Sequence, residues 1–124
     1  MTDAKKSIRP VIKNIGTSKN KSAEEDFQNT ILRPIIKMQH ELLIAFFNHH
    51  VKKRKVDMVG LSSLKKNELI SNIFKSDTNF KTEVRGLILG HFTVGEYTLY
   101  ESMASDMNKR ILTMIKERLL SVFV

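Results

Sequence analysis

The feature that most constrains this chain is an apolar-rich segment at residues 27–51, which reads FQNTILRPIIKMQHELLIAFFNHHV. In a helix, apolar residues at steps of three and four form one stripe. One such stripe holds Phe27, Ile31, Ile35, Met38, Leu42, and Ala45 or Phe46. A second holds Leu32, Ile36, Leu43, Phe47 and Val51. A helix with so much apolar circumference must be covered by several neighbours. The segment therefore predicts the buried central helix of a helical fold.

Pro34 leaves two readings of this helix open. Inside a helix, proline removes one backbone hydrogen bond and crowds the preceding turn, whereas in the first turn it costs little. The chain therefore forms either one helix from about Ala23 that is kinked at Pro34, or a turn followed by a helix that begins near Pro34. We favour the kinked helix, because the apolar stripe keeps its phase from Phe27 across the proline.

The remainder of the chain predicts further helices, because no segment shows the sustained two-residue alternation of strands. Residues that cap or stop these helices are expected at Ser62 or Ser63, Asp77 or Thr78, Gly90, and the Thr93–Glu96 capping box. Gly86 is expected to let another helix pack closely. The last helix, residues 94–122, either breaks within residues 102–108 or continues as one. We predict an all-α fold, a small bundle of three to five helices with long first and last helices and two short ones between.

The formal charge of the chain is unevenly distributed. Lys and Arg total 21 against 13 acidic residues, which gives a net charge of +8 over 124 residues. Residues 1–22 and the run Lys52, Lys53, Arg54 and Lys55 hold this excess, so the rest of the chain is nearly neutral. We expect residues 1–22 to form a basic, mostly disordered arm and residues 23–124 to form a single helical domain.

Composition excludes several classes of protein. The chain has no cysteine, which excludes disulfides and thiolate metal sites and suits a reducing compartment. The N-terminal residues lack the apolar core of a signal peptide, and no stretch approaches the roughly 18 uninterrupted apolar residues of a membrane span. We expect a cytoplasmic protein with no membrane contact.

No motif predicts catalysis, a cofactor or a metal. The sequence contains no glycine-rich phosphate loop and no G-x-S-x-G nucleophile motif. His49 and His50 are adjacent, so a helix points them roughly 100° apart, which suits chelation of one ion poorly. A metal site in the bundle would need His91 with Glu96 or Glu101, and we favour hydrogen-bonded histidines near helix ends instead. We therefore predict no catalytic, cofactor-binding or metal-ligating residues and a non-enzymatic protein.

Self-association is the function that the apolar pattern favours. A short chain with one broadly apolar helix has few elements with which to cover it, and exposed apolar surface usually marks a partner site. We expect a homodimer, or contact with another protein, through helix faces that include Phe46 and Phe47.

The alternative function is that of a nucleic-acid-binding or regulatory protein that uses the basic arm and the run of residues 52–55. Clusters of basic residues attract phosphate backbones. The candidate contacts are Lys5, Lys6, Arg9, Lys13, Lys52, Lys53, Arg54 and Lys55. The helix after residue 77 offers only Lys81 and Arg85 for base contacts, with Glu83 between them, so sequence-specific reading is weakly supported.

Three segments resemble a family of small bacterial all-helical proteins of unassigned function, some of which carry the label glyoxalase. The segments are FQNTILRPIIKMQHEL, GHFTVGEYTLY and NKRILTMIKERL, and the resemblance covers roughly residues 25–122. It implies a helical bundle. Glyoxalase I enzymes hold a divalent metal on the strands of βαβββ modules, and glyoxalase II enzymes carry a T-H-x-H-x-D-H motif. The sequence predicts no strands and contains no such motif, so we expect no glyoxalase activity.

Overall fold

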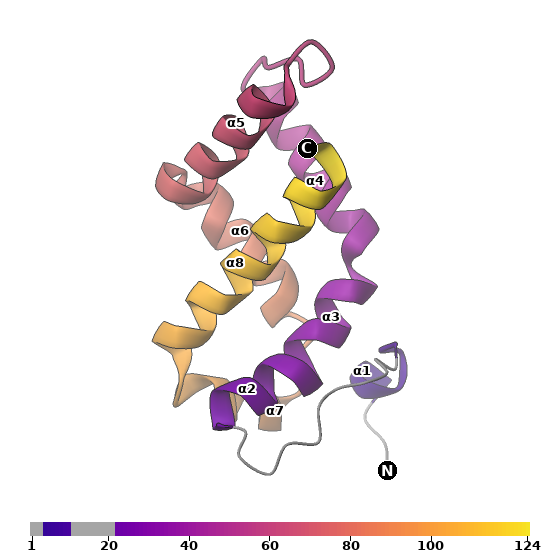
Figure 1. Ribbon diagram of the computed structural model, residues 1–124. Coiled ribbons are helices and arrows are strands. Elements are labelled where there is room, and N and C mark those ends of the chain that lie inside the picture. The colour runs from indigo at the N-terminus through magenta and orange to yellow at the C-terminus, as the bar shows by residue number, and fades with distance from the viewer. Residues whose placement is uncertain (1–3, 11–21) are drawn as a thin grey trace.

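Figure 1 shows the computed structural model, which describes residues 4–10 and 22–124. Within these residues the chain is helical and has no strand, which confirms the predicted all-α class. In chain order the elements are α1 (Ala4–Ser7), α2 (Ala23–Phe27), a π-helical segment η1 (Gln28–Leu32), α3 (Arg33–Met38), α4 (His40–Lys53), α5 (Ser63–Ser76), α6 (Thr78–Leu89), α7 (Val94–Glu101) and α8 (Ala104–Phe123). The described part therefore has more helical segments than the predicted three to five, because local interruptions divide the long helices.

The segments from α2 to α4 follow one another as one long rod (Figure 1). Ser22 caps its start by accepting a hydrogen bond from the Glu25 amide. Before Pro34 the helix widens into the π turn η1, in which the Arg33 amide bonds to the Gln28 carbonyl. The rod is interrupted again at Gln39, where φ is −91° and ψ is 9°. The structure therefore agrees with a helix from Ala23 that continues past the proline, although the proline lies in the first turn of α3.

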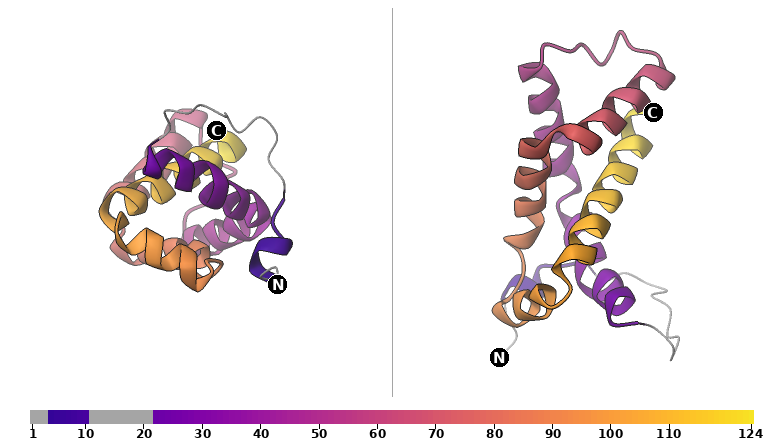
Figure 2. Two further views of the ribbon diagram at one scale, coloured as in Figure 1. Left: turned by 90° about the horizontal axis from the view of Figure 1, so that it is seen from below. Right: turned by 90° about the vertical axis from the view of Figure 1, so that its left-hand side faces the viewer.

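The bundle has three long helical stretches, namely α2–α4, α5–α6 and α8, and the short helix α7 crosses one end of it. The rod α2–α4 rises from one end, α5 and α6 return towards that end, α7 lies across it, and α8 rises again (Figures 1 and 2). The hydrophobic core lies between these helical stretches. Both apolar stripes of residues 27–51 contribute to it, through Phe27, Leu32, Ile35, Ile36, Leu43, Phe47 and Val51. From α8 it receives Met107, Ile111, Ile115 and Leu119, spaced by four residues. The broadly apolar helix is thus covered within one copy of the chain.

Polar caps fix where the later helices begin and end. Ser62 caps α5, Asp77 caps α6 by accepting the Phe80 amide, and α6 ends at Gly90. Thr93 and Glu96 form the predicted capping box at the start of α7. The last helix breaks at Ser102 and Met103, which confirms one of the two alternatives. Each of these side-chain caps bonds an amide three residues away, so it can be predicted from the nearby sequence.

Two backbone positions depart from expectation. Gly86 is exposed, and a Cβ built there would meet nothing within 4 Å, so the predicted close helix packing at Gly86 is wrong. At the end of α4, Lys55 has a positive φ of 59°. The Lys55 amide bonds to the Lys52 carbonyl at 2.9 Å and the Val56 amide to the Val51 carbonyl at 3.0 Å. This is a Schellman ending that usually places glycine where Lys55 stands.

No helix of the described residues has the length and apolarity needed to cross a membrane.

Candidate functional site

Arg9 anchors the N-terminal segment to the turn between α6 and α7. Its Nη1 donates to Glu96 Oε2 at 2.7 Å, and its Nη2 donates to Glu96 Oε1 at 2.7 Å and to the His91 carbonyl at 2.6 Å. Lys5 Nζ donates to the Phe92 carbonyl at 2.9 Å. The side chains of Arg9 and Glu96 are only 7% and 8% exposed. A buried bidentate ion pair thus holds residues 4–10 on the bundle, within the arm of residues 1–22 for which we expect disorder over most of its length.

Glu96 is charged in this site. Burial by itself would raise the pKa of Glu96, but hydrogen bonds from Arg9 and from the Thr93 amide outweigh it, and the pKa is lowered from its ordinary value. Sequence reasoning found Glu96 as a helix cap but missed its partner. Arginine at position 9 gave no local signal, because the contact spans 87 residues.

His91 lies in this turn, beside the Arg9–Glu96 pair. Its Nε2 lies 2.7 Å from Gln39 Nε2, which links the turn to the α3–α4 interruption. Burial lowers the pKa of His91, and the positive charges of Arg9 and Lys5 lower it further. Among the described residues no group of three His, Asp or Glu side chains converges on a point that could hold a metal ion. Glu96 in particular already binds Arg9, so the His91–Glu96 pairing is not a ligand set.

A second polar cluster joins α4 to α6. His50 Nε2 lies 2.8 Å from Asp77 Oδ2, and Arg54 Nη1 lies 3.7 Å from the same oxygen. The Phe80 amide is the largest cause of a lowered pKa at Asp77, and His50 and Arg54 add to it against the opposing effect of burial. The His50 ring also lies 4.7 Å from the ring of Phe80. The cluster fixes a helix start and is structural.

The predicted nucleic-acid contacts are dispersed by the fold. Arg9, one of the predicted contacts, is buried against Glu96, so little of its side chain is accessible. Lys5 donates to the Phe92 carbonyl, Lys6 is exposed, and Lys13 lies outside the described residues. Lys52, Lys53, Arg54 and Lys55 are exposed at the opposite end of the bundle from α1 (Figure 1). The described residues 4–10 and the run of residues 52–55 therefore do not form one surface.

The predicted interface residues belong to the core. Phe47 is fully buried and packs on Phe80 and Phe123, with ring centroids 6.2 and 5.1 Å away. Phe46 is partly buried, with its ring 5.6 Å from that of Phe80. Of the two residues predicted to contact a partner, Phe47 is therefore already covered by α6 and α8, and Phe46 is only partly accessible.

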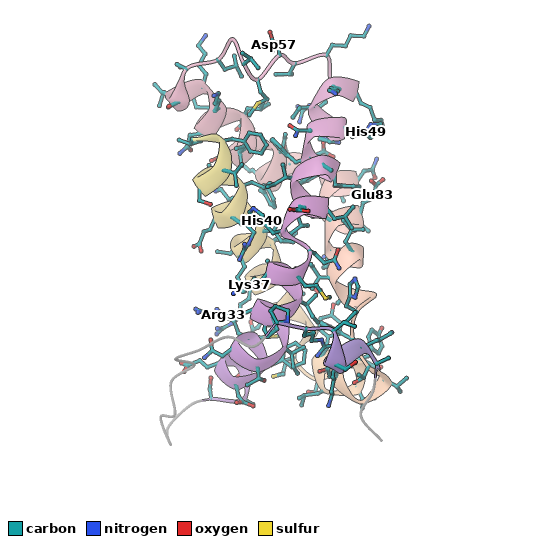
Figure 3. The ribbon with its side chains drawn as sticks, turned by 90° about the vertical axis from the view of Figure 1, so that its right-hand side faces the viewer. Arg33, Lys37, His40, His49, Asp57 and Glu83 are labelled. Carbon is teal, nitrogen blue, oxygen red and sulfur yellow. The ribbon has the colours of Figure 1, made fainter. Side chains whose placement is uncertain are left out.

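A groove between the first rod and α8 gathers charges that the sequence does not place together. It has a volume of about 450 Å³ and is lined by Gln28, Arg33, Ile36, Lys37, Met114, Glu117, Arg118 and Ser121. A neighbouring hollow of about 410 Å³ shares Lys37 and Arg118 with it. Figure 3 shows Arg33, Lys37 and His40 following one another along the side of the rod on which α8 lies. We call Arg33, Lys37 and Arg118 the basic groove.

Comparison of the chain with protein-family models, with curated proteins and with solved structures gives no match.

Proposed function

We propose that this chain is a non-enzymatic, cytoplasmic helical protein that forms a homodimer through the α1–α7 end of its bundle. The supporting observation is where exposed apolar side chains gather. Val94 is 85% exposed, Ile8 is 61% exposed, and Tyr97 and Leu99 are each 46% exposed. All belong to α7 or directly follow α1, and both elements lie at one end of the bundle (Figures 1 and 2). Exposed apolar side chains that lie at the same end of a fold favour an interface there.

The opposite end also exposes apolar side chains, but its charge opposes pairing with a copy of itself. Val59 and Leu64 lie in and just after the connection from α4 to α5, close in the chain to the exposed run of residues 52–55. Two such ends would bring cations against cations, which disfavours association. At the α1–α7 end the described residues include two adjacent exposed lysines, Lys5 and Lys6, rather than a run of four cations, so it is the better candidate for a symmetric contact.

The α1–α7 end is also shaped and fixed in a way that suits an interface. A hollow of about 540 Å³ lies there between α1, η1, α3 and α7, with Ile31, Pro34 and Leu99 among its apolar walls. The Arg9–Glu96 pair ties the α1 segment to α7, so Ile8 and α7 are presented on one rigid surface. A side chain from a second copy can fill this hollow and bury apolar area on both partners.

Sedimentation of matched leucine variants tests the proposal. Leu99 at the α1–α7 end is 46% exposed, whereas Leu42 on the side of α4 is 47% exposed. At micromolar concentration we expect the unmodified chain and Leu42→Lys to be dimers and Leu99→Lys to be a monomer, because a charge at the interface centre must lose its hydration. A monomeric unmodified chain, or equal behaviour of the two variants, would contradict the proposal.

A further inference from the structure

The basic groove holds cations without ion-pair partners in the described part of the chain. The ion pairs among the described residues are Arg9 with Glu96, and His50 and Arg54 with Asp77, and none involves Arg33, Lys37 or Arg118. Glu117 lines the groove and Glu41 lines the neighbouring hollow, so these walls are not purely cationic. Neither carboxylate lies within 4.0 Å of a groove cation. The cations therefore remain available to an external anion.

Hydrogen bonds hold the two sides of the groove together. Arg118 Nη1 donates to His40 Nδ1 at 3.0 Å, and Arg110 Nη1 donates to Gln28 Oε1 at 2.6 Å. Because arginine only donates, His40 Nδ1 is the acceptor of this bond. These bonds join α8 to the first rod across 78 and 82 residues. Arg118 is thereby oriented along the groove, while Arg33 and Lys37 lie one helical turn apart on α3.

We infer that the basic groove binds the phosphodiester backbone of single-stranded nucleic acid, without regard to base sequence. The two connected hollows provide repeated cations along a path, which suits a chain of phosphates better than one small anion. Among the residues that line the two hollows there is no Phe or Tyr, and His40 supplies the one ring, so we expect contacts to the phosphate backbone rather than base stacking to carry the affinity. A single strand is flexible enough to follow a groove between two helices. A duplex is stiff, so we expect it to contact mainly the outer surfaces of the two helices. The groove is distinct from the α1–α7 end proposed as the dimer contact.

Fluorescence anisotropy of a labelled oligothymidine strand with the full chain tests this inference. The groove variant combines Arg33→Gln with Lys37→Gln, and the control combines Lys52→Gln with Lys53→Gln. All four side chains are exposed and both variants remove two charges. For single strands the log–log salt slope falls by about 0.7 per lost phosphate contact. We therefore expect the groove variant to lower the slope by about 1.4 and to weaken binding about 25-fold near ~0.1 M salt. The control should retain the slope.

Three results would overturn the inference. These are no binding at ~50 mM salt, an equal loss in the control variant, and a matched duplex that binds as tightly as the strand. An equal loss in the control would show that general positive charge, or residues 52–55, carries the affinity. Arg118→Gln is the third variant, and it should weaken binding from the α8 side of the groove. Circular dichroism of each variant checks that helix content is retained.

Discussion

Removal of Arg9 gives the sharpest test of how the N-terminal segment is held. In Arg9→Ala, Glu96 loses both guanidinium hydrogen bonds and the His91 carbonyl loses its donor. Glu96 keeps only the Thr93 amide, through the capping box at the start of α7. The variant therefore leaves a carboxylate that is 8% exposed in the native structure without its counter-charge.

The structure sets the size of the expected loss. Breaking a buried ion pair by removing one partner typically costs about 3–5 kcal/mol. Two features reduce this figure. Arg9 Nε is buried with no hydrogen-bond partner among the described residues, and an unmet donor of this kind costs about 1–3 kcal/mol in the native protein. Release of the short segment also lets water reach Glu96. We expect Arg9→Ala to lower the free energy of unfolding by about 2–3 kcal/mol at neutral pH.

The stability lost in Arg9→Ala should depend on pH, and the lowered pKa of Glu96 gives the direction of this dependence. Because the folded-state pKa of Glu96 lies below its ordinary value of 4.5, the charged pair stabilises the fold fully above that value. The stabilisation disappears as the pH falls through the lowered pKa. The difference in free energy of unfolding between the unmodified chain and Arg9→Ala is therefore largest at neutral pH and becomes smaller in acid.

Urea unfolding followed by circular dichroism measures these differences. A double-mutant cycle with Glu96→Gln should give a coupling of about 2 kcal/mol, because the two side chains share two charge-assisted bonds. Lys6→Ala is the control, since Lys6 is exposed in the same segment and should change stability by less than about 0.5 kcal/mol. A loss below about 0.5 kcal/mol in Arg9→Ala, or no coupling with Glu96, would refute this reasoning.

Four further substitutions probe the fold by the same unfolding assay. Gly86→Ala should stabilise the chain by about 0.5–1 kcal/mol, because a Cβ there meets nothing within 4 Å and alanine favours the helix; destabilisation would mean that a neighbour packs on Gly86. Lys55→Gly should also stabilise, by about 0.5 kcal/mol, since glycine relieves the positive φ of 59°. Lys52→Gly, inside the last turn of α4, should instead destabilise by about 1 kcal/mol; equal effects at the two positions would contradict the assigned helix ending. Ile111→Ala should lower stability by about 2–5 kcal/mol, because Ile111 is fully buried on α8; a change below about 1 kcal/mol would be inconsistent with this core.

The sequence by itself determined the elements whose causes are local. Caps at Ser62, Asp77 and Thr93 satisfy amides three residues away, so each can be recognised in a short window. The apolar stripes of residues 27–51 follow from helical spacing, and both stripes contribute buried residues to the core, although Leu42 of the first stripe stays 47% exposed. Local spacing therefore predicted the all-α class and most helix boundaries.

Tertiary structure alone decided which residues meet and which remain exposed. In the sequence, nothing near Arg9 indicates a partner, whereas in the folded chain it binds Glu96, 87 residues away. The sequence suggested that Phe47 remains available to a partner, whereas in the folded chain α6 and α8 cover it. The basic groove exists only because α3 and α8 lie side by side. These outcomes depend on the long-range packing of helix faces, for which the spacing of residues in one sequence carries no signal.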